Sequence, residues 1–261
     1  MTLPRIMRPL VTVAGLLLVW EGIVRLFVLP PYILPSPAKV AVAFANSGDL
    51  LLAQAAVTVA EMLLGLLFGA ALGAAAALGL LLSPAARRWL LPVLVASQAV
   101  PVFALAPLLV LWFGFGMASK VIMAMLIIFF PVAVTLYDGL RRTEPGWLDL
   151  AEVMTGGDPR HRFRILFRIR LMAALPAFAS GLKVAAAVAP IGAVIGEWVG
   201  ASAGLGFLML QANARVQTDL MFAALIALAL CAVTLYAAVD VLTRRLLPWQ
   251  TDRFVPVNPR E

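Results

Sequence analysis

The sequence predicts an all-α, polytopic membrane protein with six transmembrane helices and a cytoplasmic helix–turn–helix loop. The first reason is composition: of 261 residues, 63% are hydrophobic and only 13% are charged, whereas a soluble domain has about a quarter of charged residues. The second is a set of six apolar runs near the roughly 20 residues that cross a bilayer. The third is the uneven distribution of lysine and arginine. Together they predict one transmembrane domain over residues 1–261.

The first apolar run follows Arg5 and Arg8, as the core of a signal peptide would. No small-x-small cleavage site follows it, so we expect an uncleaved first span. The prolines that begin the next segment cannot continue a helix, and residues 38–45 suit an interfacial helix on the outer side. The predicted spans are residues 10–29, 56–83, 89–113, 118–138, 177–199 and 220–243.

The orientation follows from the basic residues. With the N-terminus inside, fifteen of the 20 lysines and arginines fall in inner segments, and only Lys39, Lys120 and Arg215 fall in outer ones. Because basic residues concentrate in cytoplasmic loops, both termini are predicted to be cytoplasmic. The net charge of +7 does not indicate a nucleic-acid partner, because these residues lie between apolar spans.

Several charged residues fall within predicted spans. Glu21 and Arg25 lie one helical turn apart, which favours an i,i+4 ion pair over a polar contact in a pathway. Glu61 is either a functional acid inside the membrane or a residue near the outer interface. For Lys183 we expect a side chain that reaches the cytoplasmic interface rather than a buried partner.

Small residues recur every four positions in two spans. Such stripes let helices approach closely in a membrane, where lipid removes the hydrophobic drive for association. The predicted packing residues are Gly65, Gly69, Gly73, Gly192 and Gly196.

Two segments are candidates for the pathway and its gate. Prolines interrupt the third span, and broken helices are tolerated where they line a cavity, which suggests Gln98, Pro101 and Phe103 as lining residues. The glycines after the fifth span suit a tight gate loop with Glu197, Trp198, Gly204 and Gly206. Residues 207–216 suit a short outer helix.

The longest polar passage is the inner loop at about residues 144–176. It has five arginines within residues 160–170. A Gly-Gly-Asp-Pro sequence at 156–159 breaks it into two short helices. The second, Arg160 to Leu171, has apolar and basic faces, so it suits docking to a partner protein.

The chain lacks the residues of several other functions. Its one histidine, His161, and one cysteine, Cys231, do not form a metal site, and no glycine-rich loop ends in Gly-Lys-Ser/Thr to hold ATP. No inward-facing acids cluster at one depth, as proton-coupled carriers need. We therefore expect no covalent chemistry and no cofactor in this chain, so energy for transport would come from a partner at the arginine-rich loop.

Three short motifs resemble the permease subunits of bacterial binding-protein-dependent ATP-driven importers, of the nitrate, sulfonate and taurine type. They are Leu34-Pro35-Ser36-Pro37 after the first span, Ala151-Glu152-Val153 with Gly156 or Gly157 in the inner loop, and Gly204-Leu205-Gly206. Residues 169–176 are similar to the end of the family's cytoplasmic loop, although Met172 stands where proline is usual. Residues 179–198 and 211–215 resemble the branch that imports hydroxymethylpyrimidine, a thiamine precursor.

The resemblance implies a type I importer in the bacterial inner membrane. Two permeases would pair, a periplasmic or lipoprotein solute-binding protein would deliver the solute, and separate ATPase subunits would bind ATP and magnesium. The arginine-rich loop would transmit the motion of the ATPase. The residues expected to couple to it are Ala151, Glu152, Val153, Gly156, Gly157, Arg160, Phe163, Arg164 and Phe167.

Overall fold

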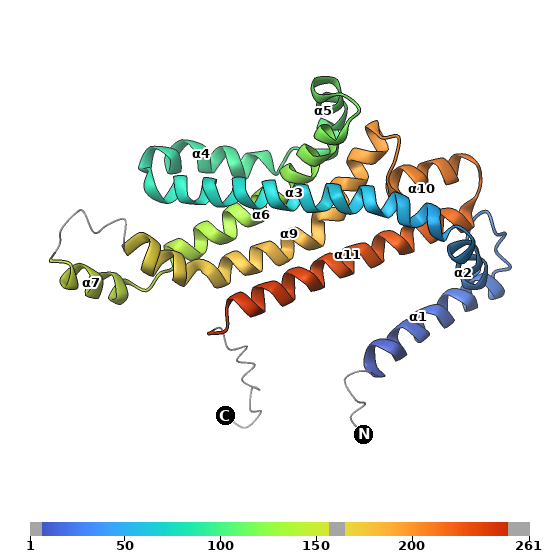
Figure 1. Cartoon of the computed structure of the whole chain (residues 1–261), viewed down its shortest axis with the longest axis horizontal. Coiled ribbons are helices and arrows are strands. Elements are labelled where there is room, and N and C mark those ends of the chain that lie inside the picture. The colour runs from blue at the N-terminus through green and yellow to red at the C-terminus, as the bar shows by residue number, and fades with distance from the viewer. Residues whose placement is uncertain (1–6, 157–164, 250–261) are drawn as a thin grey trace. The chain divides into compact units, whose positions relative to one another are not determined.

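The structure, a computed structural model, describes residues 7–156 and 165–249 (Figure 1). These residues form helices joined by short connections, with no strand among them. In chain order the elements are α1 (Met7–Leu26), α2 (Pro37–Asn46), α3 (Gly48–Leu82), α4 (Pro84–Ser97), the 3-10 helix η1 (Val102–Leu105), α5 (Ala106–Phe113), α6 (Met117–Arg141), α7 (Pro145–Met154), the π-helix η3 (Leu166–Arg170), α9 (Leu171–Gly200), α10 (Leu205–Ala214) and α11 (Thr218–Leu246).

Four helical stretches are long and apolar enough to cross a membrane. They are α3, α6, the stretch from Arg168 to the end of α9, and α11, with 35, 25, 33 and 29 residues. A fifth span is formed if α4 and the η1–α5 pair are counted as one broken helix. The predicted all-α, multi-pass architecture is therefore confirmed, while the count of six spans stays a prediction.

The predicted third span, residues 89–113, is not one helix. α4 begins earlier than expected because Pro84 suits the first helical turn and Ser83 caps it, accepting a hydrogen bond from the N–H of Ala86 (3.1 Å). The axis then bends by 92° between α4 and the η1–α5 pair. Pro101 lies at this bend and has no N–H to continue the helix, so the predicted interruption by proline is present, while the prediction that residues 89–113 form one span stays a prediction.

The helix of the predicted fifth span begins well before the predicted first residue, 177. η3 continues directly into α9, so the helix already exists at Leu166. Residues 168–175 are arginine, isoleucine, leucine, methionine and alanine, which favour helix and contain no breaker. Gly157, Arg160, Phe163 and Arg164 lie outside the described residues.

The chain divides into two compact units. Unit 1 consists of Met1–Leu63, Leu105–Met123 and Pro190–Ala232, and unit 2 of Leu64–Ala104, Ala124–Ala189 and Val233–Glu261. The core of unit 1 joins α2, α3, α10 and α11 through Val40, Leu51, Leu205, Leu208, Ala223, Ala224 and Ala227. The core of unit 2 joins α3, α4, α6 and α9 through Ala77, Leu80, Leu94, Leu136, Tyr137, Leu140 and Ala174.

In unit 2 the glycine stripe of α3 lies against α6. The contacts advance in step along the two helices, which therefore run parallel: Gly65 faces Ala124, Gly69 faces Ile128, and Gly73 faces Val132. A Cβ atom added to Gly73 would lie 2.9 Å from the carbonyl oxygen of Phe129. The backbones are thus so close that no side chain fits between them at this point.

Candidate functional site

A polar stripe on the first half of α3 is the starting point of the first candidate site. Gln54, Thr58 and Glu61 follow one another at i, i+4 and i+7, so they share one face of the helix. Thr58 and Glu61 are 0% exposed. Burying polar and charged groups is unfavourable unless they are paired, and their partners come from α6, α9 and α10 of the same unit.

Two of these side chains bind the N-terminus of α10. The backbone N–H of Gly204 donates to Oε1 of Gln54 (2.6 Å), and the N–H of Leu205 donates to Oγ1 of Thr58 (2.8 Å). The first N–H groups of any helix have no acceptor within the helix. Here α3 supplies the acceptors, and α10 has no side-chain cap from its own N-cap residue.

Glu197 of α9 completes this arrangement. Its Oε2 atom accepts hydrogen bonds from the N–H groups of Gly206 (2.5 Å) and Phe207 (3.3 Å), and its Oε1 atom accepts one from the Thr58 hydroxyl (2.6 Å). A carboxylate at a helix N-terminus also interacts favourably with the helix dipole. We name the side chains of Gln54, Thr58 and Glu197 the α10 clamp.

Steric contact with Glu197 explains why residues 204 and 206 are glycines. A Cβ atom on Gly204 would collide with the carboxyl group of Glu197, and one on Gly206 would lie 2.7 Å from its Oε2 atom. Gly204 also has a φ of +115°, a conformation that side chains other than glycine rarely adopt. Glycine at both positions lets the carboxylate reach the backbone of α10.

An ion pair lies next to the α10 clamp. The Nζ atom of Lys120 is 2.9 Å from Oε1 of Glu61, and the two side chains are 7% and 0% exposed. A Cβ atom on Gly196 would lie 3.0 Å from the Cα atom of Lys120, so the missing side chain lets α9 approach α6 here. Lys120, which the orientation argument counted with the outer segments, lies in the first turn of α6. Glu61 is thus buried and paired, and both readings of its place, inside the membrane or near the outer interface, stay open.

The structure brings together three of the predicted gate residues, Glu197, Gly204 and Gly206. Gly192 is buried in α9. The other predicted gate residues are exposed on the described surface: Phe103 by 63% and Trp198 by 50%, with Gln98 and Pro101 at the bend after α4.

The sequence did not single out Gln54 or Thr58. The signal available was the i, i+4, i+7 spacing of three polar residues at the start of a long apolar run. That spacing places them on one face, but it does not reveal which backbone they bind.

A second candidate site lies at α7, the first half of the predicted coupling loop. α7 begins with Pro145 and ends at Met154, and Gly156 follows the cap residue Thr155 with a φ of +63°, which suits the residue after a helix cap. Ala151 is buried, whereas Glu152 and Val153 are exposed, Val153 by 79%. The side chain of Phe167 lies outside the described residues.

α7 borders an apolar cavity of about 710 Å³. Its walls come from α7, from the start of α9 and from the end of the described chain. The lining residues are Arg142, Thr143, Glu144, Trp147, Leu150, Ala151, Met154, Arg168, Ile169, Met172, Ala173, Pro176 and Trp249. The cavity and the exposed apolar residues of α7 form a surface suited to a protein partner.

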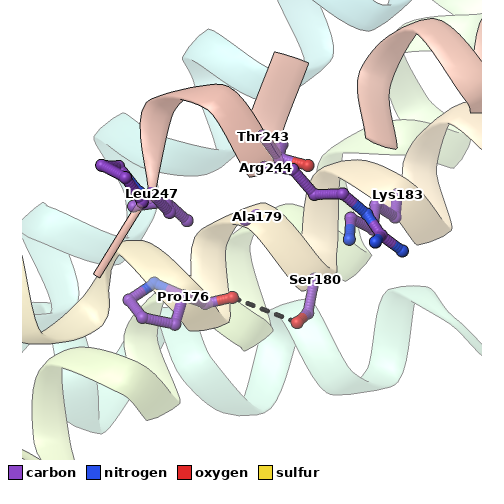
Figure 2. Close-up of a pocket in the computed structure, with 8 residues that line it drawn as sticks. Pro176, Ala179, Ser180, Lys183, Thr243, Arg244 and Leu247 are labelled. Carbon is purple, nitrogen blue, oxygen red and sulfur yellow. Dashed lines mark hydrogen bonds between the residues drawn. The ribbon is translucent and has the colours of Figure 1, made fainter. Parts of the chain in front are cut away.

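A smaller pocket of about 250 Å³ lies between α9 and α11. Figure 2 shows the ends of the Lys183 and Arg244 side chains on one side of the pocket, with Ser180 donating to the carbonyl oxygen of Pro176 (3.1 Å). Asp240 pairs with both cations: Lys183 Nζ lies 2.6 Å from its Oδ1 atom, and Arg244 Nε lies 2.9 Å from its Oδ2 atom. Lys183 therefore has a partner in Asp240, and both side chains are partly exposed rather than buried; its reach to the cytoplasmic interface stays a prediction.

The Lys183–Asp240 pair is expected to contribute little to stability. The two side chains are 28% and 22% exposed, so water screens the pair. We expect Lys183→Met to lower the free energy of unfolding by about 1 kcal/mol or less, measured by thermal unfolding in detergent micelles with the exposed Lys39→Met as control. A loss several times larger would show that the pair is buried in the working protein.

Two other sequence readings can be compared with the described residues. Glu21 and Arg25 form the predicted i,i+4 ion pair, with Arg25 Nε 2.6 Å from Glu21 Oε1, so that prediction is confirmed. Among residues 7–156 and 165–249, no group of three or more histidine, cysteine, aspartate or glutamate side chains is arranged to hold a metal ion.

Comparison with known proteins gives consistent relatives. A probable ABC transporter permease of Haemophilus influenzae is 51% identical over 93% of this chain and 98% of its own length. The riboflavin transport permease RibX of Chloroflexus aurantiacus is 39% identical over 93% and 90%, and the formylaminopyrimidine transport permease ThiX of Halalkalibacterium halodurans is 36% identical over 90% and 92%. The taurine transport permease TauC of Escherichia coli also matches, at 30% identity.

A family model, described as the inner-membrane component of binding-protein-dependent transport systems, matches residues 65–251. These residues include α7, Glu197 of α9 and all of α10. The long apolar helices indicate a membrane protein, and the relatives that match along nearly their whole length are transport permeases. The chain belongs to the family of inner-membrane components of binding-protein-dependent transport systems, as an ABC transporter permease similar to those for formylaminopyrimidine, sulfonates and taurine.

Proposed function

We propose that the chain is the pathway-forming subunit of an ATP-driven importer and performs no ATP hydrolysis itself. Residues 1–261 form one permease domain with six spans and cytoplasmic termini, and two copies pair in the bilayer. A separate ATPase binds the loop at residues 144–176, and a periplasmic or lipoprotein solute-binding protein delivers the solute. The family match and the relatives support the transport role, and the basic inner segments support the orientation.

The surface of α7 is the observation that carries the coupling proposal. α7 is a helix of 10 residues with exposed apolar side chains, next to an apolar cavity. Trp147, Leu150, Val153 and Met154 are between 53% and 79% exposed. A helix with apolar residues on its outer face, in a segment predicted to lie in water, needs a protein surface to cover it.

We expect Val153→Asp to weaken the association of the permease with its ATPase at least about tenfold. Burying a valine contributes about 1.5 kcal/mol or more, which corresponds to about a factor of ten in affinity, and the new carboxylate must lose water in the interface. The amount of ATPase that copurifies with the permease measures the loss of association. ATP hydrolysis stimulated by the solute-loaded binding protein measures the loss of coupling.

Trp89→Asp is the matched control for Val153→Asp. Trp89 of α4 is 76% exposed and Val153 is 79% exposed; Val153 lies in the predicted inner loop, and Trp89 lies at the inner end of the predicted third span. The control should retain the ATPase. If Val153→Asp binds as much ATPase as the unchanged protein, α7 is not the docking helix.

For the solute we propose a small polar heteroaromatic molecule, hydroxymethylpyrimidine or another thiamine precursor. The relative named for formylaminopyrimidine and the similarity at residues 179–198 support this choice. Nitrate, a sulfonate or taurine is the alternative. A calorimetric binding assay on the cognate binding protein decides: tight binding of taurine and none of hydroxymethylpyrimidine would remove the first choice.

A stand-alone carrier or channel is the rival class. The family match does not favour it, but the distinction can be measured directly. Vesicles that contain only this chain should neither accumulate the solute nor release it down a gradient, whereas vesicles with the ATPase, ATP and the binding protein should accumulate it.

A further inference from the structure

α10 depends on other helices for its stability. It has 10 residues, and isolated helices shorter than about 12–15 residues are marginal in water. Leu205 is 0% and Leu208 is 3% exposed, and both belong to the core of unit 1. The helix is therefore held from its buried side and at its N-terminus.

The α10 clamp uses every N–H group of the first turn. Four consecutive N–H groups, from Gly204 to Phe207, donate to side chains of α3 and α9. If α10 left this position, these N–H groups and the buried carboxylate of Glu197 would lose their partners together. Unpaired buried polar groups are strongly unfavourable, so α10 is poorly suited to move as an independent flap.

Thr58 is the link between the two sides of the clamp. Its hydroxyl accepts from the N–H of Leu205 and donates to Glu197. Only a side chain that both donates and accepts at this place can join α3, α9 and α10, and a hydroxyl does this. Valine has the same shape but neither capability.

We infer that Glu197 and Thr58 are positioning residues that fix α10 to α3 and α9 throughout transport, so that α10 follows these helices and does not open by itself. This inference rests on the proposed importer function, and it gives Thr58 and Glu197 a role in transport that does not involve contact with the ATPase. By the predicted orientation α10 lies on the outer side, where the solute enters. A detached α10 would let ATP hydrolysis proceed without productive solute entry.

The test uses the complete transporter, with ATPase and binding protein, in lipid nanodiscs and proteoliposomes. Thr58→Val and Glu197→Gln are compared with Thr58→Ser, which keeps the hydroxyl. Thr135→Val is the matched control, because the Thr135 hydroxyl donates to Pro131 and Val132 of its own helix. Solute taken up per ATP hydrolysed is the first readout. Tryptic cleavage after Arg215, the exposed residue that ends α10, is the second.

We expect Thr58→Val and Glu197→Gln to retain the ATPase but to lose at least fivefold in solute taken up per ATP, with faster cleavage at Arg215. Thr58→Ser and Thr135→Val should behave as the unchanged protein. Unchanged uptake per ATP in both variants would overturn the inference, as would equal losses of uptake and ATP hydrolysis with unchanged cleavage. If Glu197→Gln does not fold, Thr58→Val alone decides. If the unchanged complex shows no stimulated ATP hydrolysis, the proposed function itself fails.

Discussion

Lys120→Met is expected to lower the free energy of unfolding by about 3–5 kcal/mol, the range for removing one partner of a buried ion pair. Glu61 is 0% exposed, and its Oε2 atom has no hydrogen-bond partner among the described residues. The ammonium of Lys120, 2.9 Å from Oε1, therefore offsets the burial of this charge. Unfolding of the purified permease in mixed micelles, followed by circular dichroism, measures the effect.

A double substitution separates the destabilisation caused by an unpaired charge from the destabilisation caused by lost packing. In Glu61→Leu/Lys120→Met no charge is left without a partner, so much of the stability should return, as it does when apolar residues replace buried ion pairs. The control is Arg25→Met, which breaks the exposed pair with Glu21 and should change the free energy of unfolding by about 0.5 kcal/mol. If Lys120→Met costs no more than Arg25→Met, water reaches Glu61 in the folded protein.

Gly73→Leu is expected to have the second largest effect, a loss of about 3 kcal/mol or a failure to fold, at the upper end of the range for overpacked cores. A Cβ atom at this position would lie 2.9 Å from the carbonyl oxygen of Phe129 and 3.0 Å from the Cβ atom of Val132. A backbone carbonyl cannot rotate away as a side chain would, so α3 and α6 would have to separate.

Gly79→Leu provides the control on the same helix. No atom lies within 4 Å of a Cβ at Gly79, so the larger side chain should be accommodated there. The amount of folded protein in detergent and its midpoint of thermal unfolding measure both variants. Equal behaviour of the two would mean that α3 and α6 do not pack closely at Gly73.

The fold class and most helix positions could be predicted from the sequence because they depend on local properties. Apolar runs longer than a bilayer is thick, together with prolines and caps, indicate where helices begin and end. The short helix predicted at 207–216 is α10, and the one predicted at 38–45 is α2. The prolines also indicated the interruption near Pro101, but they did not give the bend of 92°. At residue 177 nothing stops the helix, so the start of the fifth helix was missed.

The candidate sites were predicted only in part. Glu197 and the glycines of 204–206 stood out because acids and paired glycines are unusual in such an apolar chain. The sequence did not indicate the partners of Lys120 and Lys183, because it shows a charge but not what faces that charge from another helix. Lys120 pairs with Glu61 from a distant segment, and Lys183 pairs with Asp240.

The sequence by itself determined that this protein is helical and apolar, because each of these properties is a sum over neighbouring residues. Only the tertiary structure decided that Gln54, Thr58 and Glu197 meet the backbone of α10. The physical reason is that such contacts depend on the rotation and axial offset of packed helices. Many segments of the sequence have the same periodicity, so each of them could place its polar residues on one face of a helix. Close packing of the helices then decides which neighbouring helix that face contacts.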